Sequence, residues 1–125
     1  MQGFAIHPYS PDMAWSPTSM DTVRAQLQAI PDAKDKPFHI TEFGWATGGN
    51  DTSTDWATTE ATQAAWFADA LPKMMARSDV AKIYVYQLVD QQTSNVGNSE
   101  MHYGLLHDDQ VTQKPAYAKV KALIA

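Results

Sequence analysis

The chain repeats one order: a short apolar run, a polar loop, then a stretch whose apolar residues recur every three or four positions. Residues 3–7, 38–44 and 81–90 are the apolar runs, and each is short enough to be a strand. Strands that alternate with amphipathic helices indicate strand–helix units of an α/β fold. The pattern therefore predicts one domain of three units. These units span residues 1–36, 37–79 and 80–125.

Each predicted helix has a polar start and one apolar face. Thr18 or Ser19 caps the first helix, Thr58 or Thr59 caps the second, and Pro115 lies in the first turn of the third. The apolar faces consist of Met20, Val23, Leu27 and Ile30, then Trp66, Phe67, Ala70, Leu71, Met74 and Met75, and finally Tyr117, Val120, Leu123 and Ile124.

Two local features interrupt these patterns. Pro72 falls within the second helix, so we expect a kink or an early break near Leu71. Asp108 and Asp109 predict a turn, with a small hairpin over residues 105–115.

Strands joined by helices predict a parallel sheet, and ligands of such folds lie beyond the carboxyl ends of the strands. Polar and aromatic side chains follow each predicted strand at this end. They are His7 and Tyr9, then Glu42 and Trp45, then Gln87 and Asp90. Glu42 is a candidate for chemistry, and the alternative is a strand-terminal carboxylate paired with a basic neighbour. His7 has a structural alternative as a hydrogen-bonded histidine, and the tryptophans 15, 45 and 56 either stack on sugars or cover the core.

Composition narrows the function classes. The 125 residues are 44% hydrophobic and 18% charged, which is typical of a folded protein. A net charge of −5 with scattered basic residues argues against nucleic acid, and no apolar run is long enough for a bilayer. The start of the chain lacks a signal-peptide pattern, so the sequence predicts a soluble chain whose location stays open. With no cysteine and no ligand-like histidine spacing, we expect neither a metal nor another cofactor.

Four segments together carry a family resemblance: HPYSP, ITEFGW, IYVYQLVD and KPAYAKVKALI. In this order they resemble the last three β/α units of a (β/α)8-barrel glycoside hydrolase. The similarity is to the clan of retaining enzymes that includes cellulases, β-xylosidases and β-mannanases, and it covers nearly the whole chain. It implies a partial barrel that acts on an oligosaccharide or polysaccharide.

The resemblance also implies residue roles. Glu42 occupies the position of the clan's nucleophile, at the end of the seventh strand. The residues placed at the substrate are His7, Tyr9, Trp45, Tyr86 and Gln87.

Two departures from the clan matter. Its general acid/base glutamate belongs to a strand that would precede Gly3, so we expect this chain to lack it. Asp90 is the best internal substitute, and Asp12 and Asp51 lie in loops. The tryptophan platform common at the end of the eighth strand is also absent, or is replaced by Tyr86.

Strand alternation assigns Phe38, Ile40 and Glu42 to one side of the sheet and directs Glu42 into the barrel. A three-unit sheet then leaves an apolar inner face and both edges uncovered, which favours assembly with copies of itself or with a complementary barrel fragment. Three readings stay open. In the first, the chain is part of a glycoside hydrolase and is active only when the missing strands are supplied. In the second, it is an inactive self-assembling protein with a residual sugar-binding cleft. In the third, it is an unrelated β/α enzyme.

Overall fold

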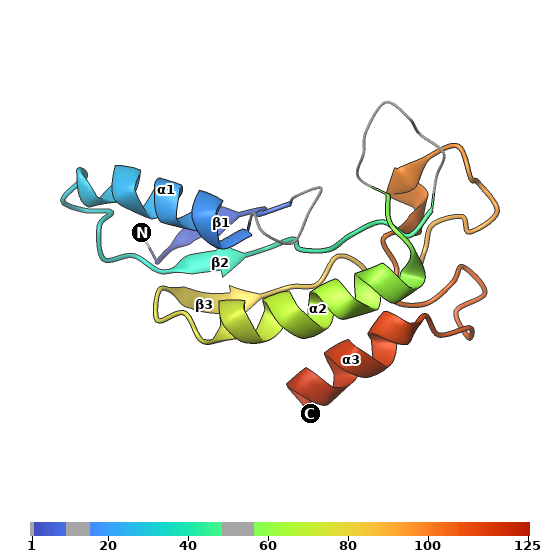
Figure 1. The fold of residues 1–125 in the computed structure, drawn as a ribbon. Coiled ribbons are helices and arrows are strands. Elements are labelled where there is room, and N and C mark those ends of the chain that lie inside the picture. The colour runs from blue at the N-terminus through green and yellow to red at the C-terminus, as the bar shows by residue number, and fades with distance from the viewer. Residues whose placement is uncertain (1, 10–15, 49–56) are drawn as a thin grey trace.

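The computed structural model describes residues 2–9, 16–48 and 57–125. Strands and helices alternate within these ranges, in the order that the sequence predicts (Figure 1). The elements are β1 Phe4–Ile6, α1 Ser16–Gln28, β2 Phe38–Ile40, α2 Glu60–Met75, β3 Val80–Ile83, the 3₁₀ helix η1 Ser99–His102 and α3 Pro115–Ile124.

The described strands form one parallel sheet in the order β1-β2-β3. Phe4 pairs with Phe38 and Ile6 with Ile40, so the first two strands are in simple register. An irregularity between Phe38 and His39 shifts the register with β3. The α/β class and the parallel sheet are thus confirmed, and β3 occupies one edge of the sheet.

The third strand is shorter than the predicted 81–90. Regular pairing ends at Ile83, although the Tyr84 and Tyr86 N–H groups still donate to the Ile40 and Phe43 carbonyls. Val89 then bridges Leu106. The apolar residues that suggested one long strand therefore pair first with β2 and its continuation and then with Leu106. Only the pairing with β2 forms a ladder.

Helix boundaries confirm some predictions and correct others. Thr59 is the N-cap of α2, and its side chain accepts from the Thr62 N–H at 3.1 Å. The predicted break near Leu71 is wrong, because α2 continues through Pro72 to Met75. Pro72 is solvent-exposed, so its ring lies on the side of the helix away from the core.

The two other helices differ from prediction mainly at one end. Helix α1 begins at Ser16, before the expected caps, and ends at Gln28. Pro115 occupies the first turn of α3 as predicted. Three apolar residues assigned to buried helix faces are largely exposed instead, because each lies at or beyond a helix end. They are Ile30 at 51%, Met75 at 53% and Ile124 at 73%.

The predicted face of the sheet is also wrong. Phe38 and Ile40 are fully buried in the core with Phe67 and Leu71 of α2, so they face the helices and not the barrel interior. Their partners in β1 and β3 pack against the same core. The opposite face carries the row Ala5, His39 and Lys82. This inner face is short and largely polar, which removes the apolar surface on which the self-assembly argument rested.

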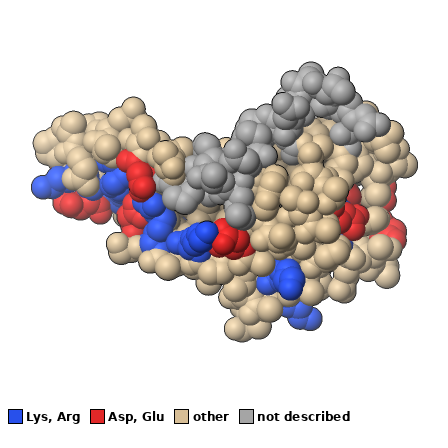
Figure 2. Space-filling model, viewed as in Figure 1, with Lys and Arg blue, Asp and Glu red and all other residues tan. Residues whose placement is uncertain are grey.

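Basic and acidic side chains are interleaved near the amino ends of the strands, and Figure 2 shows them side by side on the visible face. Asp79, just before β3, accepts from Arg77 and from Arg24 of α1. The Arg77 hydrogen bonds lower the pKa of Asp79, and the hydrogen bond from Arg24 adds to the effect. This cluster links α1 to the turn before β3. No helix in the described ranges has the length and apolar character needed to cross a membrane.

Candidate active site

Glu42 lies just beyond β2, between two residues that follow β1. The Tyr9 hydroxyl donates to Glu42 Oε2 at 3.0 Å, and His7 Nδ1 lies 3.6 Å from the same oxygen. His7 Nε2 is 2.8 Å from the Thr41 hydroxyl, which fixes the plane of the imidazole. The structure therefore brings together three of the residues that the sequence singled out.

The end of β2 determines where Glu42 points. Thr41 is exposed, while Phe43 returns to the core against Phe67 at 5.9 Å between ring centroids. Regular alternation is lost beyond Ile40, so Glu42 shares a side with His7 and Tyr9 although Ile40 faces the helices. The alternation argument behind the direction predicted for Glu42 is thus wrong, and its direction into a barrel stays a prediction.

An aromatic group adjoins this carboxylate. The Tyr103 ring lies between Tyr9 and Tyr86, with centroid distances of 5.7 Å and 5.6 Å and edge-to-face geometry. Burial, followed by the hydrogen bond to Glu42, raises the pKa of Tyr9 well above its ordinary value. Burial likewise raises the pKa of Tyr103 to about 12. Both phenols therefore stay protonated at neutral pH, and Tyr9 remains a donor to the Glu42 carboxylate.

Close backbone approach connects this group to the third unit. A Cβ on Gly44 would collide with the Tyr86 carbonyl oxygen, so only glycine fits there. The Tyr86–Gln87 peptide bond is cis. Gln87 exchanges backbone hydrogen bonds with Tyr103 and Leu105, and its side-chain nitrogen is buried with no partner among the described residues.

Trp45 lies apart from these residues. It is 2% exposed and packs edge-to-face on Phe43, Trp66 and Phe67. Its indole covers the core, and a sugar ring has no access to it in this arrangement. Residues 12, 15, 51 and 56, also considered above, lie outside the described residues.

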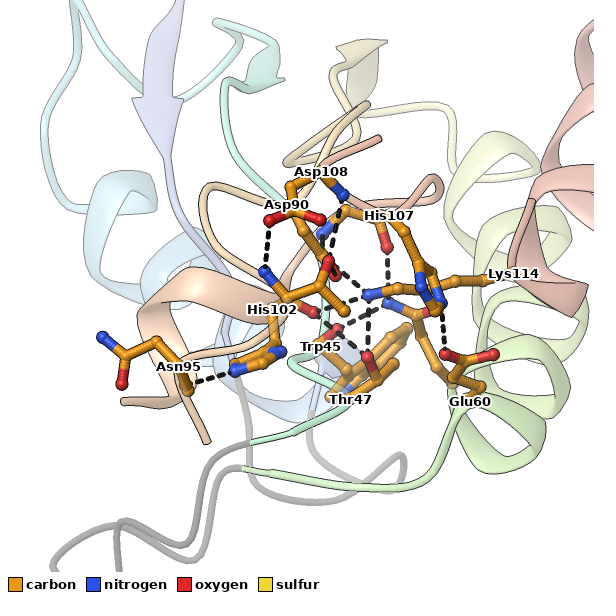
Figure 3. Close-up of polar contacts among 12 residues, drawn as sticks. Trp45, Thr47, Glu60, Asp90, Asn95, His102, His107, Asp108 and Lys114 are labelled. Atoms are coloured by element: carbon orange, nitrogen blue, oxygen red, sulfur yellow. Dashed lines mark hydrogen bonds and ion pairs between the residues drawn. The ribbon is translucent and has the colours of Figure 1, made fainter. Parts of the chain in front are cut away.

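A second polar group, the Lys114–Asp90 network, follows β2 and β3 and is buried (Figure 3). The Lys114 ammonium donates to Asp90 Oδ1 and Thr47 Oγ1, both at 2.7 Å, and to the His102 carbonyl at 3.1 Å. Asp90 Oδ1 also accepts from the Gly104 N–H at 2.7 Å. Asp90 is therefore fully engaged, and it is unsuited to the role of an internal acid/base.

This network also ties down the long loop after β3. His102 Nε2 lies 2.6 Å from the Asn95 carbonyl, and His107 Nε2 lies 2.7 Å from Glu60 at the start of α2. Burial lowers the pKa of Lys114, while its partner Asp90 opposes the shift. Lys114 was missed because a lysine before Pro115 looks like a surface residue, and no spacing connects it to Asp90.

Among the described residues, no cluster of three or more histidine and carboxylate side chains could hold a metal ion. The side chains described at the exposed site are one carboxylate, its tyrosine donor and a histidine.

A family model decides the class of protein. The model of Glycosyl hydrolase family 10 matches residues 3–123, so the chain belongs to this family. The reading as an unrelated β/α enzyme is thereby excluded. Among curated proteins, no sequence matches the chain.

Solved structures agree on the fold. A family 39 glycoside hydrolase from Bacteroides cellulosilyticus matches 96% of this chain and 26% of its own length, with a TM-score of 0.67 and 19% identity. A GH5_18 structure from Streptomyces cattleya in complex with GlcNAc matches over 98% and 30%, with a TM-score of 0.68 and 15% identity. The β-glucuronidase of Bifidobacterium dentium matches over 100% and 21%, with a TM-score of 0.67 and 18% identity. The chain thus spans less than a third of each of these structures and has the fold of part of a glycoside hydrolase barrel.

Proposed function

We propose that this chain is the three-unit, carboxyl-terminal part of a retaining glycoside hydrolase, with Glu42 as its nucleophile. One observation carries the proposal: Glu42 meets His7 and the Tyr9 hydroxyl beyond the carboxyl ends of two neighbouring parallel strands. Its side chain is 39% exposed, so a carboxylate oxygen remains accessible to a substrate. The family membership supports a carbohydrate substrate.

The proposed reaction has two steps. A Glu42 oxygen attacks the anomeric carbon as the bond from that carbon to the leaving oxygen breaks, and a second carboxylic acid protonates this oxygen. Water, deprotonated by the same second group, then displaces Glu42. Tyr9 orients the Glu42 carboxylate by donating to Oε2, and His7 lies beside the same oxygen.

The second carboxyl group has to lie about 5–5.5 Å from Glu42. Asp90 is ion-paired with Lys114 and buried, so we assign the acid/base role to a β/α unit outside this sequence. Loops of several units determine sugar specificity in such barrels, which is why we name only the carbohydrate class.

The engagement of Asp90 favours a second candidate function as well. In this alternative the chain binds sugar in a residual cleft at His7, Tyr9, Tyr86 and Gln87 but performs no turnover. Binding of an oligosaccharide by the chain alone, measured by calorimetry, without hydrolysis after the remaining barrel units are supplied, would favour this alternative.

The test of the proposed nucleophile uses the chain supplemented with the remaining units of a family 10 barrel. A fluorinated aryl glycoside should form a stable glycosyl adduct on the peptide that contains Glu42, as detected by mass spectrometry. Hydrolysis of an ordinary aryl glycoside should fall by at least about 10³-fold in Glu42→Gln. Glu100→Gln, at an exposed glutamate of η1, is the matched control. An adduct on another residue, or full activity of Glu42→Gln, would refute the assignment.

A further inference from the structure

Tyr103 connects the exposed group around Glu42 with the buried Lys114–Asp90 network. It directly follows the 3₁₀ helix η1, in the loop after β3, and it is 4% exposed. The sequence pattern assigned it no role, because it is remote along the chain from every predicted strand end. Its ring contacts the first group, and the peptide groups on either side of it contact the second.

The Tyr103 ring supports the residue that donates to Glu42. Its edge-to-face contact with Tyr9 has a centroid distance of 5.7 Å, and its contact with Tyr86 has one of 5.6 Å. Aromatic pairs of this geometry favour one relative orientation of the two rings. The Tyr9 hydroxyl in turn donates to Glu42 Oε2 at 3.0 Å. The place of that hydroxyl, and with it one oxygen of the carboxylate, therefore depends on where the Tyr103 ring lies.

The Lys114–Asp90 ion pair holds both peptide groups that flank Tyr103 (Figure 3). The Lys114 ammonium donates to the His102 carbonyl at 3.1 Å, on the peptide group before Tyr103. Asp90 Oδ1 accepts from the Gly104 N–H at 2.7 Å, on the peptide group after it. The two charged side chains meet at 2.7 Å and are buried. One buried ion pair therefore restricts the backbone rotation of Tyr103 from both sides.

Backbone contacts from the loop after β2 and from the residues after β3 add to this restriction. The Thr47 N–H and hydroxyl also donate to the His102 carbonyl, at 3.1 Å and 3.3 Å. The Gln87 N–H donates to the Tyr103 carbonyl at 3.2 Å. Tyr103 is thus fixed by segments that are distant in sequence, and its ring has little freedom to adjust.

We propose that Tyr103 is a positioning residue for Glu42 that acts through Tyr9, and that the Lys114–Asp90 ion pair fixes Tyr103 by its backbone. A reacting group has to be held within about 0.5 Å of its productive position by side chains that are themselves fixed by packing. Tyr9 is only partly buried, so its ring needs support from a buried neighbour. The ion pair thereby acts on the exposed carboxylate through two intervening tyrosines.

This inference rests on the proposed function only for its consequence, a slower reaction when Glu42 is misplaced. The positioning itself is measured without turnover, in the chain alone. The probe is the Tyr9 phenol, observed by carbon NMR of chains labelled at the tyrosine ζ carbon, and Tyr9→Phe assigns its signal. Loss of the Tyr103 ring should let water reach the Tyr9 hydroxyl and weaken its hydrogen bond to Glu42. Both changes lower the pKa of Tyr9, because burial and that hydrogen bond raise it.

Substitutions at Tyr103 test the ring contact. At about pH 11, Tyr103→Leu should raise the ionised fraction of Tyr9 by a factor of about three or more. Tyr103→Phe keeps the ring and should leave that fraction unchanged. Tyr103→Met takes the place of Tyr103→Leu if circular dichroism shows that the leucine variant is unfolded.

Leu71→Ala is the control for a merely structural loss of packing. Leu71 is 3% exposed and belongs to α2, so its truncation removes a side chain as buried as Tyr103 from another part of the core. The variant should lower the midpoint of thermal unfolding while the Tyr9 titration stays that of the unmodified chain.

The double variant Asp90→Leu/Lys114→Met tests the backbone link. It leaves no buried charge, so circular dichroism should show an intact fold. Both peptide groups beside Tyr103 nevertheless lose the ion pair as a partner. The ionised fraction of Tyr9 should therefore rise as in Tyr103→Leu, and the Gly104 amide should exchange its hydrogen faster. Lys119→Met, at an exposed lysine of α3, is the matched control and should change neither.

The outcomes separate this inference from the proposed function. A Tyr9 titration that Tyr103→Leu leaves unchanged, or that Leu71→Ala shifts equally, would overturn the inference. An unchanged titration in the double variant would refute the part assigned to the ion pair. In the completed barrel, the glycosyl adduct on Glu42 should form about tenfold more slowly in Tyr103→Leu than in Tyr103→Phe. A shifted Tyr9 titration with an adduct on another residue would refute the proposed function alone.

Discussion

Two polar groups follow the strands of this sheet, and they contrast in almost every physical respect. Around Glu42, the side chains of His7 and Glu42 are 49% and 39% exposed. In the Lys114–Asp90 network, the corresponding values are 1% and 0%. Residue types alone do not separate the two, since each contains a carboxylate, a cation-forming side chain and a threonine.

The difference lies in how completely each group is satisfied within the chain. The Lys114 ammonium has three acceptors, and Asp90 is bound by donors from the same loop region. Within the described residues, Glu42 accepts a hydrogen bond from Tyr9 alone, and its side chain keeps an accessible surface. A buried ion pair needs such full satisfaction to persist, whereas a reacting carboxylate needs an open side. We therefore regard the Lys114–Asp90 network as a scaffold and the group around Glu42 as the candidate site.

The largest expected effect comes from breaking the scaffold. Lys114→Met leaves Asp90 charged and buried without its partner, and it should lower the free energy of unfolding by about 3–5 kcal/mol. The double variant Asp90→Leu/Lys114→Met should recover part of this loss, because no buried charge is left. Urea unfolding followed by circular dichroism measures both.

Lys119→Met is the control for that experiment, since Lys119 is an exposed lysine of α3. It should change the free energy of unfolding by about 0.5 kcal/mol or less. If Lys114→Met behaved like Lys119→Met, the network would have no structural importance and the contrast would fail.

Two threonine substitutions test the same comparison, with an expected loss of stability of intermediate magnitude. Thr47→Val removes one acceptor of a buried ammonium and should cost about 1.5–3 kcal/mol of unfolding free energy. Thr41→Val removes the hydroxyl beside His7, where water can replace it, and should cost about 0.5 kcal/mol or less. Thermal unfolding of the two variants under one condition provides the ranking. Equal losses would mean that exposure does not distinguish the two groups.

Part of the fold and part of the candidate site could be predicted from the sequence. The strand–helix order, the Thr59 cap and the first turn at Pro115 could all be predicted, because each depends on neighbours a few residues apart. The meeting of His7, Tyr9 and Glu42 could also be anticipated, since parallel strands end at one edge. Their catalytic and binding roles remain predictions.

Features that depend on tertiary packing could not be predicted from the sequence. Packing with Phe67 places Phe38 on the helix-facing side of the sheet, and the loss of alternation beyond Ile40 separates Glu42 from that side. The Lys114–Asp90 pair joins residues 24 positions apart, and no local pattern marks it. Trp45 looked like a binding residue since it follows Glu42 closely, but three aromatic neighbours hold it in the core.

The last prediction concerns the Tyr9–Glu42 contact, for which we expect a small effect. Tyr9→Phe should lower the free energy of unfolding by only about 0.5–1 kcal/mol near neutral pH, because the hydrogen bond is partly exposed. At alkaline pH the contact has a distinct signature. Burial and the hydrogen bond to Glu42 raise the pKa of Tyr9 above the ordinary value of 10.0, so the folded chain keeps a proton that the unfolded chain releases.

Stability should therefore decline as pH rises above about 10, where the unfolded state binds fewer protons than the folded state. Tyr9→Phe should make this decline shallower, and Glu42→Gln should bring the ionisation of Tyr9 to lower pH by removing the adjacent negative charge. Ultraviolet difference absorbance of the phenolate during an alkaline titration measures the second effect directly. Tyr84→Phe is the control, since Tyr84 is 53% exposed and the contacts of Glu42 described above do not include it. A phenolate titration that Glu42→Gln leaves unchanged would mean that Tyr9 does not sense the carboxylate, and the contact that distinguishes Glu42 from an ordinary surface acid would be refuted.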